Sequence, residues 1–211
     1  MKYTLKLVET DKQIRDKVMK VLQPQMAKFI KATIPKLKSK IVPMLSTAIV
    51  GSPEYESILN GKLKYEFGIP DSYFKLEGLL GIWLNNIQIE YNPPKIAGSY
   101  VKTSISINMI KSDFSDVLGS DYAQVIDSQR GYGLFWLEWL LLDGRKTIVS
   151  DHEVALGPSN RSRTGFALMV SSNQDWSVPD EYAGTIKDNW ITRAIDTIKP
   201  DILNILKESL K

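Results

Sequence analysis

The residue types best suited to chemistry in this sequence are a single histidine and its acidic neighbours. His152 stands between Asp151 and Glu153. On a strand, successive side chains alternate between the two faces, so these three side chains do not converge. One histidine also excludes the two-histidine zinc motifs, and as a general base it would need a distant partner that the sequence does not identify. We therefore expect His152 to be a surface residue of a strand.

Glu138 is the most unusual carboxylate, because Phe135-Trp136-Leu137 precedes it and Trp139 follows it. Burial in such surroundings would raise its pKa and make it a candidate general acid. On a strand, however, Glu138 shares a face with Trp136 and Leu140, and that face can end at a sheet edge or a subunit contact. We favour this second interpretation, in which Glu138 pairs with an arginine.

Other catalytic and cofactor-binding motifs are missing from the sequence. There is no cysteine, which excludes thiolate metal sites and cysteine nucleophiles. Gly131-Tyr132-Gly133 lacks the third glycine of a dinucleotide site, and neither a P-loop nor a GxSxG motif occurs. We therefore predict no catalytic residue, no cofactor and no metal, and hence a protein that is not an enzyme.

A polar loop at residues 157–165 carries Arg161 and Arg163 among small hydroxyl residues. Two arginines in such a loop can grip a phosphate or a partner's carboxylates in bidentate fashion. A hairpin loop with solvent-exposed arginines is the alternative. The tryptophans around this loop fit core or interface anchors better than base-stacking platforms. They are Trp136, Trp139, Trp176 and Trp190.

The composition is that of a folded globular protein with an uneven charge. Of the 211 residues, 43% are hydrophobic and 24% charged, so we expect residues 1–211 to form a single domain. The net charge is +3, but residues 1–40 carry eleven Lys or Arg against three acids, and the remainder sixteen against twenty-one. The asymmetry indicates either a basic element facing an anionic partner or a solvated lysine face. Without a spanning apolar run or a secretory signal, we expect synthesis in the cytoplasm.

A basic helical segment is predicted at about residues 10–50. Thr10 or Asp11 can cap it, and apolar residues follow at steps of three and four, from Ile14 to Ala48. Three prolines interrupt this stripe, so we expect two or three segments with kinks rather than one straight helix. They are Pro24, Pro35 and Pro43.

Short helices and two strands should follow. Ser52 can cap a helix over 53–60 that ends at Gly61, a second helix spans 62–67, and Gly78 and Gly81 then break the chain. Alternating residues predict strands at 87–91 and 101–109, separated by a polar loop over 92–99. Residues 111–130 are expected to be irregular or weakly helical.

The last third of the chain should contain a hairpin and a final helix. FWLEWLLL (135–142) and RKTIVSDHEV (145–154) flank Asp143-Gly144, a favoured hairpin turn, although the first arm can also be a helical turn. A strand follows at 166–170, and a helix at about 186–210, with Thr185 and Asp188 at its start. The prediction is therefore an α+β fold with a mostly antiparallel sheet flanked by N-terminal and C-terminal helices.

Four segments combine motifs that are weak alone. They read IVGSPEYESILNGKLKYEFGIPD (49–71), WLEWLLLDGRKTIVSDHEVALG (136–157), RSRTGFALMV (161–170) and WSVPDEYAGTIKDNWITRAID (176–196). In this order, over roughly residues 48–198, they resemble a family of tailed-bacteriophage virion proteins. Members of that family are neck, tail-completion, tail-terminator or head–tail connector components.

The resemblance implies a structural α+β protein that forms a homo-oligomeric ring, commonly sixfold or twelvefold, between the head and the tail tube. DNA would pass through the lumen, and the neighbours would be other neck, portal-adaptor and tail-tube proteins in the virion, with no membrane. Within this frame we expect one set of residues to make interface contacts and to serve as packing anchors. The set is Glu138, Arg161, Arg163, Trp176, Trp190 and Arg193.

Three other functions stay open. The first is nucleic-acid binding through the lysine-rich N-terminal helices, which would weaken steeply with salt and vanish when Lys28, Lys31, Lys36 and Lys38 are neutralised. The second is a hydrolase built on Glu138, His152 and another carboxylate. The third is a membrane-surface role for the amphipathic N-terminus, against which the prolines argue.

Overall fold

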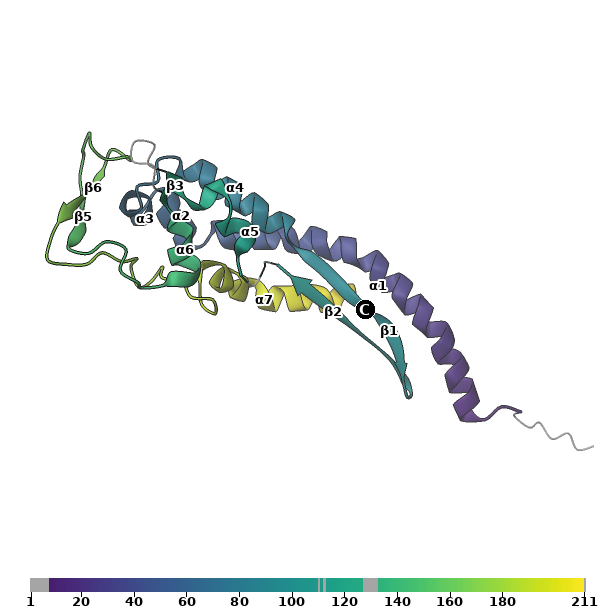
Figure 1. The fold of residues 1–211 in the computed structure, drawn as a ribbon. Coiled ribbons are helices and arrows are strands. Elements are labelled where there is room, and N and C mark those ends of the chain that lie inside the picture. Colours follow the sequence, from purple (N-terminus) through teal and green to yellow (C-terminus); the bar gives the residue numbers. More distant parts are fainter. Residues whose placement is uncertain (1–7, 110, 112, 127–132, 211) are drawn as a thin grey trace, which may run out of the picture.

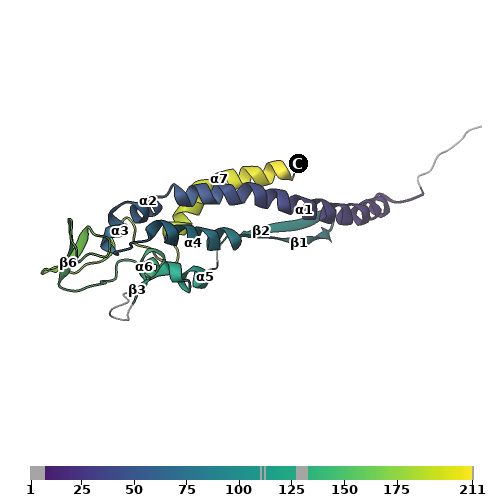
Figure 2. The same cartoon turned by 90° about the horizontal axis from the view of Figure 1, so that it is seen from above.

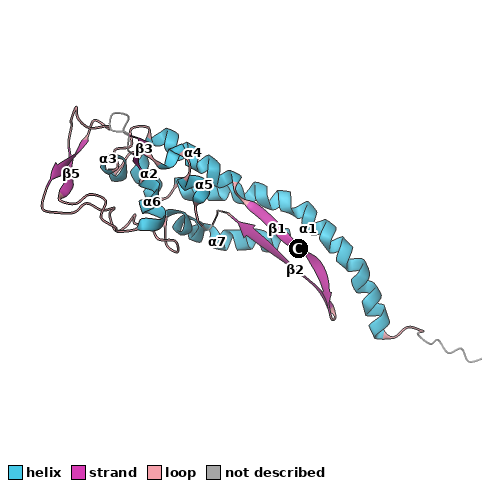
Figure 3. Ribbon diagram, viewed as in Figure 1, coloured by secondary structure: helices cyan, strands magenta, loops and turns pink. Residues whose placement is uncertain are grey.

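The molecule is elongated, with a broad end and a long helical stem (Figures 1 and 2). The computed structural model describes residues 8–109, 111, 113–126 and 133–210. Helices run along the whole length, and strands occur in separate pairs (Figure 3). We call the described parts of 51–87 and 111–189 the head, and the remainder the stem.

The stem consists of two helices and a hairpin that lie side by side. They are α1 (Asp11–Val50), α7 (Trp190–Ser209), β1 (Gln88–Ala97) and β2 (Tyr100–Asn108). The predicted α+β class is confirmed, but the sheet is not continuous. The described strands form three separate two-stranded antiparallel pairs, and the helices predicted at the two ends of the chain pack against each other.

The prediction that α1 is broken into kinked segments is wrong, because it is one helix of 40 residues. Thr10 caps it through a capping box with Gln13, as a short polar side chain at this position favours. Pro24, Pro35 and Pro43 are all exposed, so the carbonyl groups that lose a backbone partner face water. The helix curves with its outer side convex (Figure 1), which is the bend expected when solvent competes for hydrogen bonds on that side.

The first short helices of the head begin as predicted. In α2 (Pro53–Leu59) the Ser52 Oγ accepts the Tyr55 N–H at 3.2 Å, and proline occupies the first turn. The next helix is α3 (Lys62–Glu66), and Gly61 precedes it instead of closing α2.

Helix α4 (Ser72–Asn85) runs through both glycines at which we predicted a break, so that prediction is wrong. The reason is tertiary packing at Gly78. A Cβ there would overlap the ring of Tyr122, so glycine lets that ring lie directly on the helix. The contact is worth more than the roughly 1 kcal/mol by which glycine disfavours a helix.

The two strands of the hairpin are confirmed, but the polar loop predicted between them is wrong. Strand β1 continues to Ala97, and only Gly98-Ser99 remain as the turn, with Gly98 at φ +63°. The pairing register shifts between Asn92 and Lys95, where two prolines cannot donate to the ladder. A bulge therefore accommodates residues whose composition suggested a loop.

The described residues between 111 and 134 form only short elements. They are α5 (Ser115–Leu118), η1 (Asp121–Ala123), β3 (Val125–Ile126) and β4 (Gly133–Leu134). This agrees with the irregular, weakly helical prediction for residues 111–126. Residues 127–130 lie outside the described part of the chain.

The hairpin predicted around Asp143-Gly144 does not form. Its first arm is helical, which was the alternative, and only residues 152–154 of its second arm lie in a strand. The first arm forms α6 (Trp136–Glu138) and a π-helical turn, η2 (Trp139–Asp143). The apolar run is buried against several elements at once, which the strand period did not capture. Gly184 lies against this turn and donates its N–H to the Trp139 carbonyl at 3.1 Å, and a Cβ on it would overlap the Leu140 carbonyl.

The final strand pair and the start of the last helix complete the head. Strands β5 (His152–Leu156) and β6 (Ala167–Ser171) are antiparallel, which confirms the predicted strand at 166–170 and the strand position of His152. Helix α7 starts later than predicted, because Asn189 caps it and Thr185 and Asp188 form the turn before it.

Most of the core lies in the head, where fully buried tryptophans and aliphatic side chains from all its helices meet. A smaller cluster in the stem joins Leu37 and Ile41 of α1 to Ile202 of α7. None of the helices in the described ranges is long and apolar enough to cross a membrane.

Candidate interaction surfaces

Trp190, predicted as an interface anchor, is the centre of the head's own core. It is fully buried, and its Nε1–H donates to the Ser52 Oγ at 2.6 Å. Its ring meets that of Trp83 edge to face, with centroids 5.1 Å apart. Trp176 is also nearly buried and packs edge to face on Phe67. Both tryptophans therefore anchor the chain to itself.

Arg193 has its partners within the chain as well. Its Nη2 lies 3.0 Å from the Glu54 Oε1, and the side chain of Glu54 is only 4% exposed. The guanidinium also reaches Asp188, with Nη1 3.3 Å from Oδ1, and donates to the Tyr182 carbonyl. The expected interface contact of Arg193 is thus an internal ion pair that ties α7 to the start of α2.

A cleft of about 570 Å³ opens beside this ion pair, between the end of α1, α2 and α7. Its two strongest polar groups, Glu54 and Arg193, already neutralise each other. Glu181 is the further charged group that lines the cleft, and the described residues contain no group of three or more metal-ligating side chains.

The arginines of the 157–165 loop differ from each other. Arg163 lies on Gly68 and donates from Nη2 to the Phe67 carbonyl at 3.2 Å, which fastens the loop to the end of α3. Arg161 is exposed, and its backbone N–H donates to the Ser159 Oγ. Both side chains are exposed, and the difference is that the guanidinium of Arg163 is hydrogen-bonded to the head, whereas Arg161 bonds through its backbone.

The two residues considered for hydrolysis are not brought together as a reaction centre. His152 lies in β5 with Nδ1 2.9 Å from the Ser150 carbonyl. Glu138 ends α6 on the half-buried side of an apolar helix, and it makes no ion pair among the described residues. The predicted arginine partner of Glu138 is accordingly not found in this part of the structure, and the shared strand face on which it rested does not exist.

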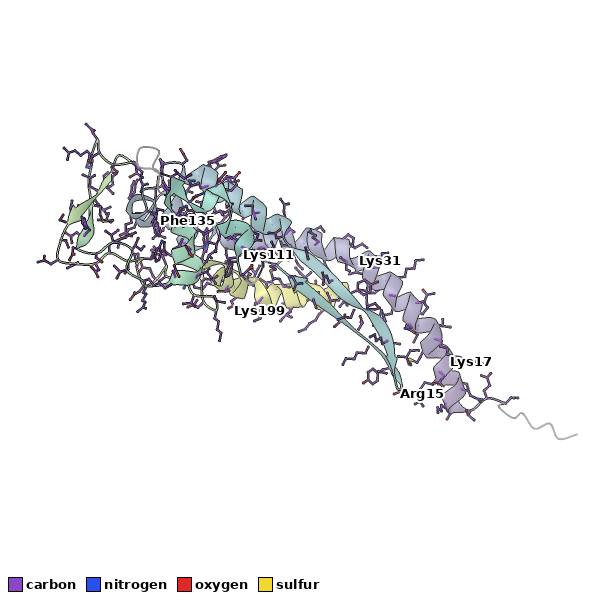
Figure 4. The ribbon with its side chains drawn as sticks, in the orientation of Figure 1. Arg15, Lys17, Lys31, Lys111, Phe135 and Lys199 are labelled. Atoms are coloured by element: carbon purple, nitrogen blue, oxygen red, sulfur yellow. The ribbon has the colours of Figure 1, made fainter. Side chains whose placement is uncertain are left out.

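Helix α1 presents a row of lysines to solvent. At about 100° per residue they fall within an arc of about 80°, roughly 120° from the buried positions Ile30, Leu37 and Ile41. Figure 4 shows Lys17 and Lys31 on the side of α1 that faces away from the hairpin. We call this row the lysine face; it comprises Lys17, Lys20, Lys28, Lys31 and Lys38. Lys36 is also exposed but points to a different side of the helix.

The first half of α1 carries a second row, which is apolar and exposed. The single apolar stripe predicted for the whole helix therefore divides into two: a buried one from Ile30 onward and an exposed one before it. The exposed row lies roughly 120° from both the lysine face and the buried face. We call it the arm stripe; it comprises Ile14, Val18, Val21, Leu22 and Phe29, which are 37% to 63% exposed.

Sequence periodicity alone does not reveal the arm stripe, because steps of three and four are the same for a covered and an uncovered face. A signal was nevertheless present. The apolar positions from Ile14 to Phe29 lie roughly 120° around the helix from those between Ile30 and Ile41, which a single packing face does not allow.

Comparison of the chain with protein families, with curated proteins and with solved structures finds no match. The fold and surfaces therefore define the class: an α+β protein with a closed aromatic head and an extended three-faced helix.

Proposed function

We propose that the protein is a structural virion component, a subunit of a ring at the phage neck or tail end that joins head and tail. The ring would be sixfold or twelvefold, with DNA passing through its lumen and with neck, portal-adaptor and tail-tube proteins as neighbours. It would act through inter-subunit contacts and not through catalysis. The four ordered motif segments that resemble the neck and tail-completion family support this proposal.

The observation that carries the proposal is that motif segments far apart in the sequence form one packed unit. Trp190, of the last segment, bonds to Ser52 of the first. Phe67 of the first segment packs on Trp136 of the second, with ring centroids 6.3 Å apart. The segments therefore build one core together, and a family that carried the same segments in the same order would be expected to share this core.

The exposed surface of α1 gives independent support. Helices of monomeric proteins seldom leave a contiguous row of large apolar residues in water, and such rows mark protein–protein contacts. The arm stripe is a row of this kind. A ring protein needs at least one surface that binds its neighbour, and the stem supplies a candidate.

Electron microscopy of the purified protein, together with light scattering, tests the proposal directly. The expected result is a closed ring with a lumen wide enough for duplex DNA, alone or after addition of phage head or tail particles. A protein that stays monomeric at high concentration and beside both kinds of particle would contradict it.

Nucleic-acid binding is a second candidate, which the lysine face favours. Its five lysines lie between positions 17 and 38 of the helix, a rise of about 31 Å, and a row of this length can follow a phosphate backbone. As an independent function it predicts DNA binding by the protein without any phage partner. As a part of the ring it predicts that the same lysines line the lumen.

A further inference from the structure

The first half of α1 is a basic helix with an apolar side that its own chain leaves uncovered. We call residues 11–29 of α1 the arm, because Ile30 is the first fully buried residue of the helix. The arm carries five basic residues against Asp11 and Asp16. Arg15 and Lys28 flank the arm stripe on its two sides, so a partner of the arm should be apolar in the middle and acidic at the edges.

The head carries a surface of this complementary kind. Large apolar side chains are exposed on α4, β3 and the residue before α6: Tyr73 65%, Phe74 66%, Ile126 60% and Phe135 50%. Three exposed acidic residues lie on or beside these elements: Asp71 directly before α4, Glu77 in α4 and Asp121 in η1. We call these seven residues the head patch.

Contacts among these elements hold the head patch together. The rings of Phe74 and Tyr122 meet edge to face at 5.5 Å, which joins α4 to η1. The Lys75 Nζ donates to the carbonyl groups of Asp121 and Gln124 at 3.0 and 2.6 Å. Lys75 keeps its positive charge, and Lys64 lies beside Asp71, Tyr73 and Phe74, so the three carboxylates outnumber the nearby ammonium groups by one and the surface is weakly acidic.

An arm cannot reach the head patch of its own chain. A helix of 40 residues is about 60 Å long, and the arm is at the end of α1 farthest from the head (Figure 1). Pairing of two arms would bring two positive surfaces together, and pairing of two head patches would bring two negative ones. Only the contact between an arm and another molecule's patch joins opposite charges.

We propose that the arm of one copy docks on the head patch of a second copy, in a head-to-tail contact that buries the arm stripe against Tyr73, Phe74, Ile126 and Phe135. Such a contact is heterologous, so repetition closes a ring if the rotation between copies allows it. The rest of the lysine face stays free in this packing, since Lys17, Lys20, Lys31 and Lys38 lie on another side of the helix and only Lys28 meets the edge of the patch. The inference rests on the proposed ring function and names the surfaces that build the ring.

Two full-length variants test the proposal, each defective on one side of the contact. The arm variant is Val18→Glu with Leu22→Glu, and the patch variant is Tyr73→Lys with Phe135→Lys. A matched control, Leu156→Glu with Ile186→Glu, places the same kind of change on exposed apolar residues outside both surfaces. Circular dichroism and thermal unfolding verify that each variant folds.

Sedimentation velocity and mass photometry then measure assembly. Each defective variant alone should associate at least about 30-fold more weakly than the wild type, as loss of a hot spot does. The control should assemble normally. An equimolar mixture of the arm and patch variants should give a complex that stops at one copy of each, because only one intact arm–patch pair remains. Raising the salt concentration should weaken that complex.

A second pair of variants keeps the test independent of the apolar changes. Arg15→Glu alone should weaken assembly, and mixing it with Asp121→Lys should restore a complex.

Several outcomes separate this inference from the proposed function. Arm or patch variants that form rings as the wild type does would overturn the docking and leave the ring function intact. A mixture that gives no complex would also overturn the docking. Open head-to-tail chains that never close and never bind phage particles would instead support the docking and contradict the ring function. A wild-type protein that is monomeric under all conditions would overturn both.

Discussion

The head and the arm differ in the burial of their apolar side chains. In the core of the head, three tryptophans are almost fully buried: Trp83, Trp136 and Trp190, the last of which enters this core from the start of α7. In the arm, five large apolar residues of a single helix remain in water. The head is therefore specified by contacts within the chain. The arm touches its own chain on one side, where the Gln23 Nε2 donates to the Pro94 carbonyl, but the arm stripe is only partly covered. Substitutions in the head should change stability, and substitutions in the arm should change association.

The largest expected loss of stability follows from Trp190→Ala. The change removes a fully buried ring, its edge-to-face contact with Trp83 and the hydrogen bond to Ser52. Large-to-small changes of this kind cost about 3–5 kcal/mol, so the midpoint of urea unfolding should fall sharply. Val21→Ala, in the arm, should shift it by less than about 0.5 kcal/mol. Equal losses of unfolding free energy at the two positions would show that the arm contributes as much to stability as the core of the head.

Arg193→Ala should produce the next largest loss. It leaves the Glu54 carboxylate almost fully buried without its cation, and loss of one partner of a buried pair costs about 3–5 kcal/mol. Because Arg193 is itself one-third exposed, we expect a value of about 2–3 kcal/mol in the same unfolding experiment.

The double variant Glu54→Leu with Arg193→Met serves as the control for this ion pair. It removes both charges, so it should recover part of the stability that the single change loses. A double variant as unstable as Arg193→Ala would show that the loss comes from packing rather than from an uncompensated charge.

The sequence predicted those parts of the fold that depend on local signals. Thr10 and Ser52 cap helices because their side-chain oxygens accept N–H groups three residues ahead, and this spacing is visible in the sequence. Alternation between apolar and polar residues likewise predicted the strands around Ile89 and Ile105. In each case the stabilising partner lies within the same segment or follows its period.

The failures all involve partners distant in the sequence. Gly78 suggested a break in the helix, but the ring of Tyr122 packs directly on this glycine. Arg193 was expected at an interface, whereas its partner Glu54 lies 139 residues earlier in the chain. The periodicity of α1 predicted a buried stripe without showing which half is covered. The candidate docking surfaces could not be predicted for the same reason, since exposure is a property of the whole fold.

The lysine face provides a test of the arm and stem without changing the head. Lys31→Gln with Lys38→Gln should lower the salt dependence of DNA binding, because each lost phosphate contact reduces the slope of log K against log salt by about 0.9. Lys36→Gln with Lys40→Gln removes the same charge from exposed positions on another side of α1. Fluorescence anisotropy with duplex DNA at several salt concentrations measures both.

The two double variants should differ in the salt dependence of DNA binding if the DNA contacts the lysine face. A smaller slope for the first pair alone would indicate that a row of lysines follows the phosphate backbone. Equal reductions for both pairs would mean that only the total charge of the stem counts, and no binding in the wild type would remove the nucleic-acid function altogether.

The smallest expected effect concerns Glu66, a carboxylate of the head that has one close cation. Its side chain is only 6% exposed, and the Lys62 Nζ lies 3.3 Å away. Burial raises the pKa of Glu66 above its ordinary value, and Lys62 offsets this only in part. Folded protein therefore holds a proton in a pH window just above the ordinary pKa, where unfolded protein has already lost it, so stability falls as pH rises through that window.

Glu66→Gln should therefore flatten the decline of unfolding free energy between weakly acidic and neutral pH, with a modest gain at neutral pH. Glu56→Gln, at an exposed position of α2, is the matched control and should leave the pH dependence unchanged. Urea unfolding at a series of pH values measures both. If Glu66→Gln kept the wild-type slope, the Lys62 ion pair would have to compensate fully for burial. The buried carboxylate of the head would then be fully stabilised by a residue of the same chain, which would add to the difference between the head and the arm.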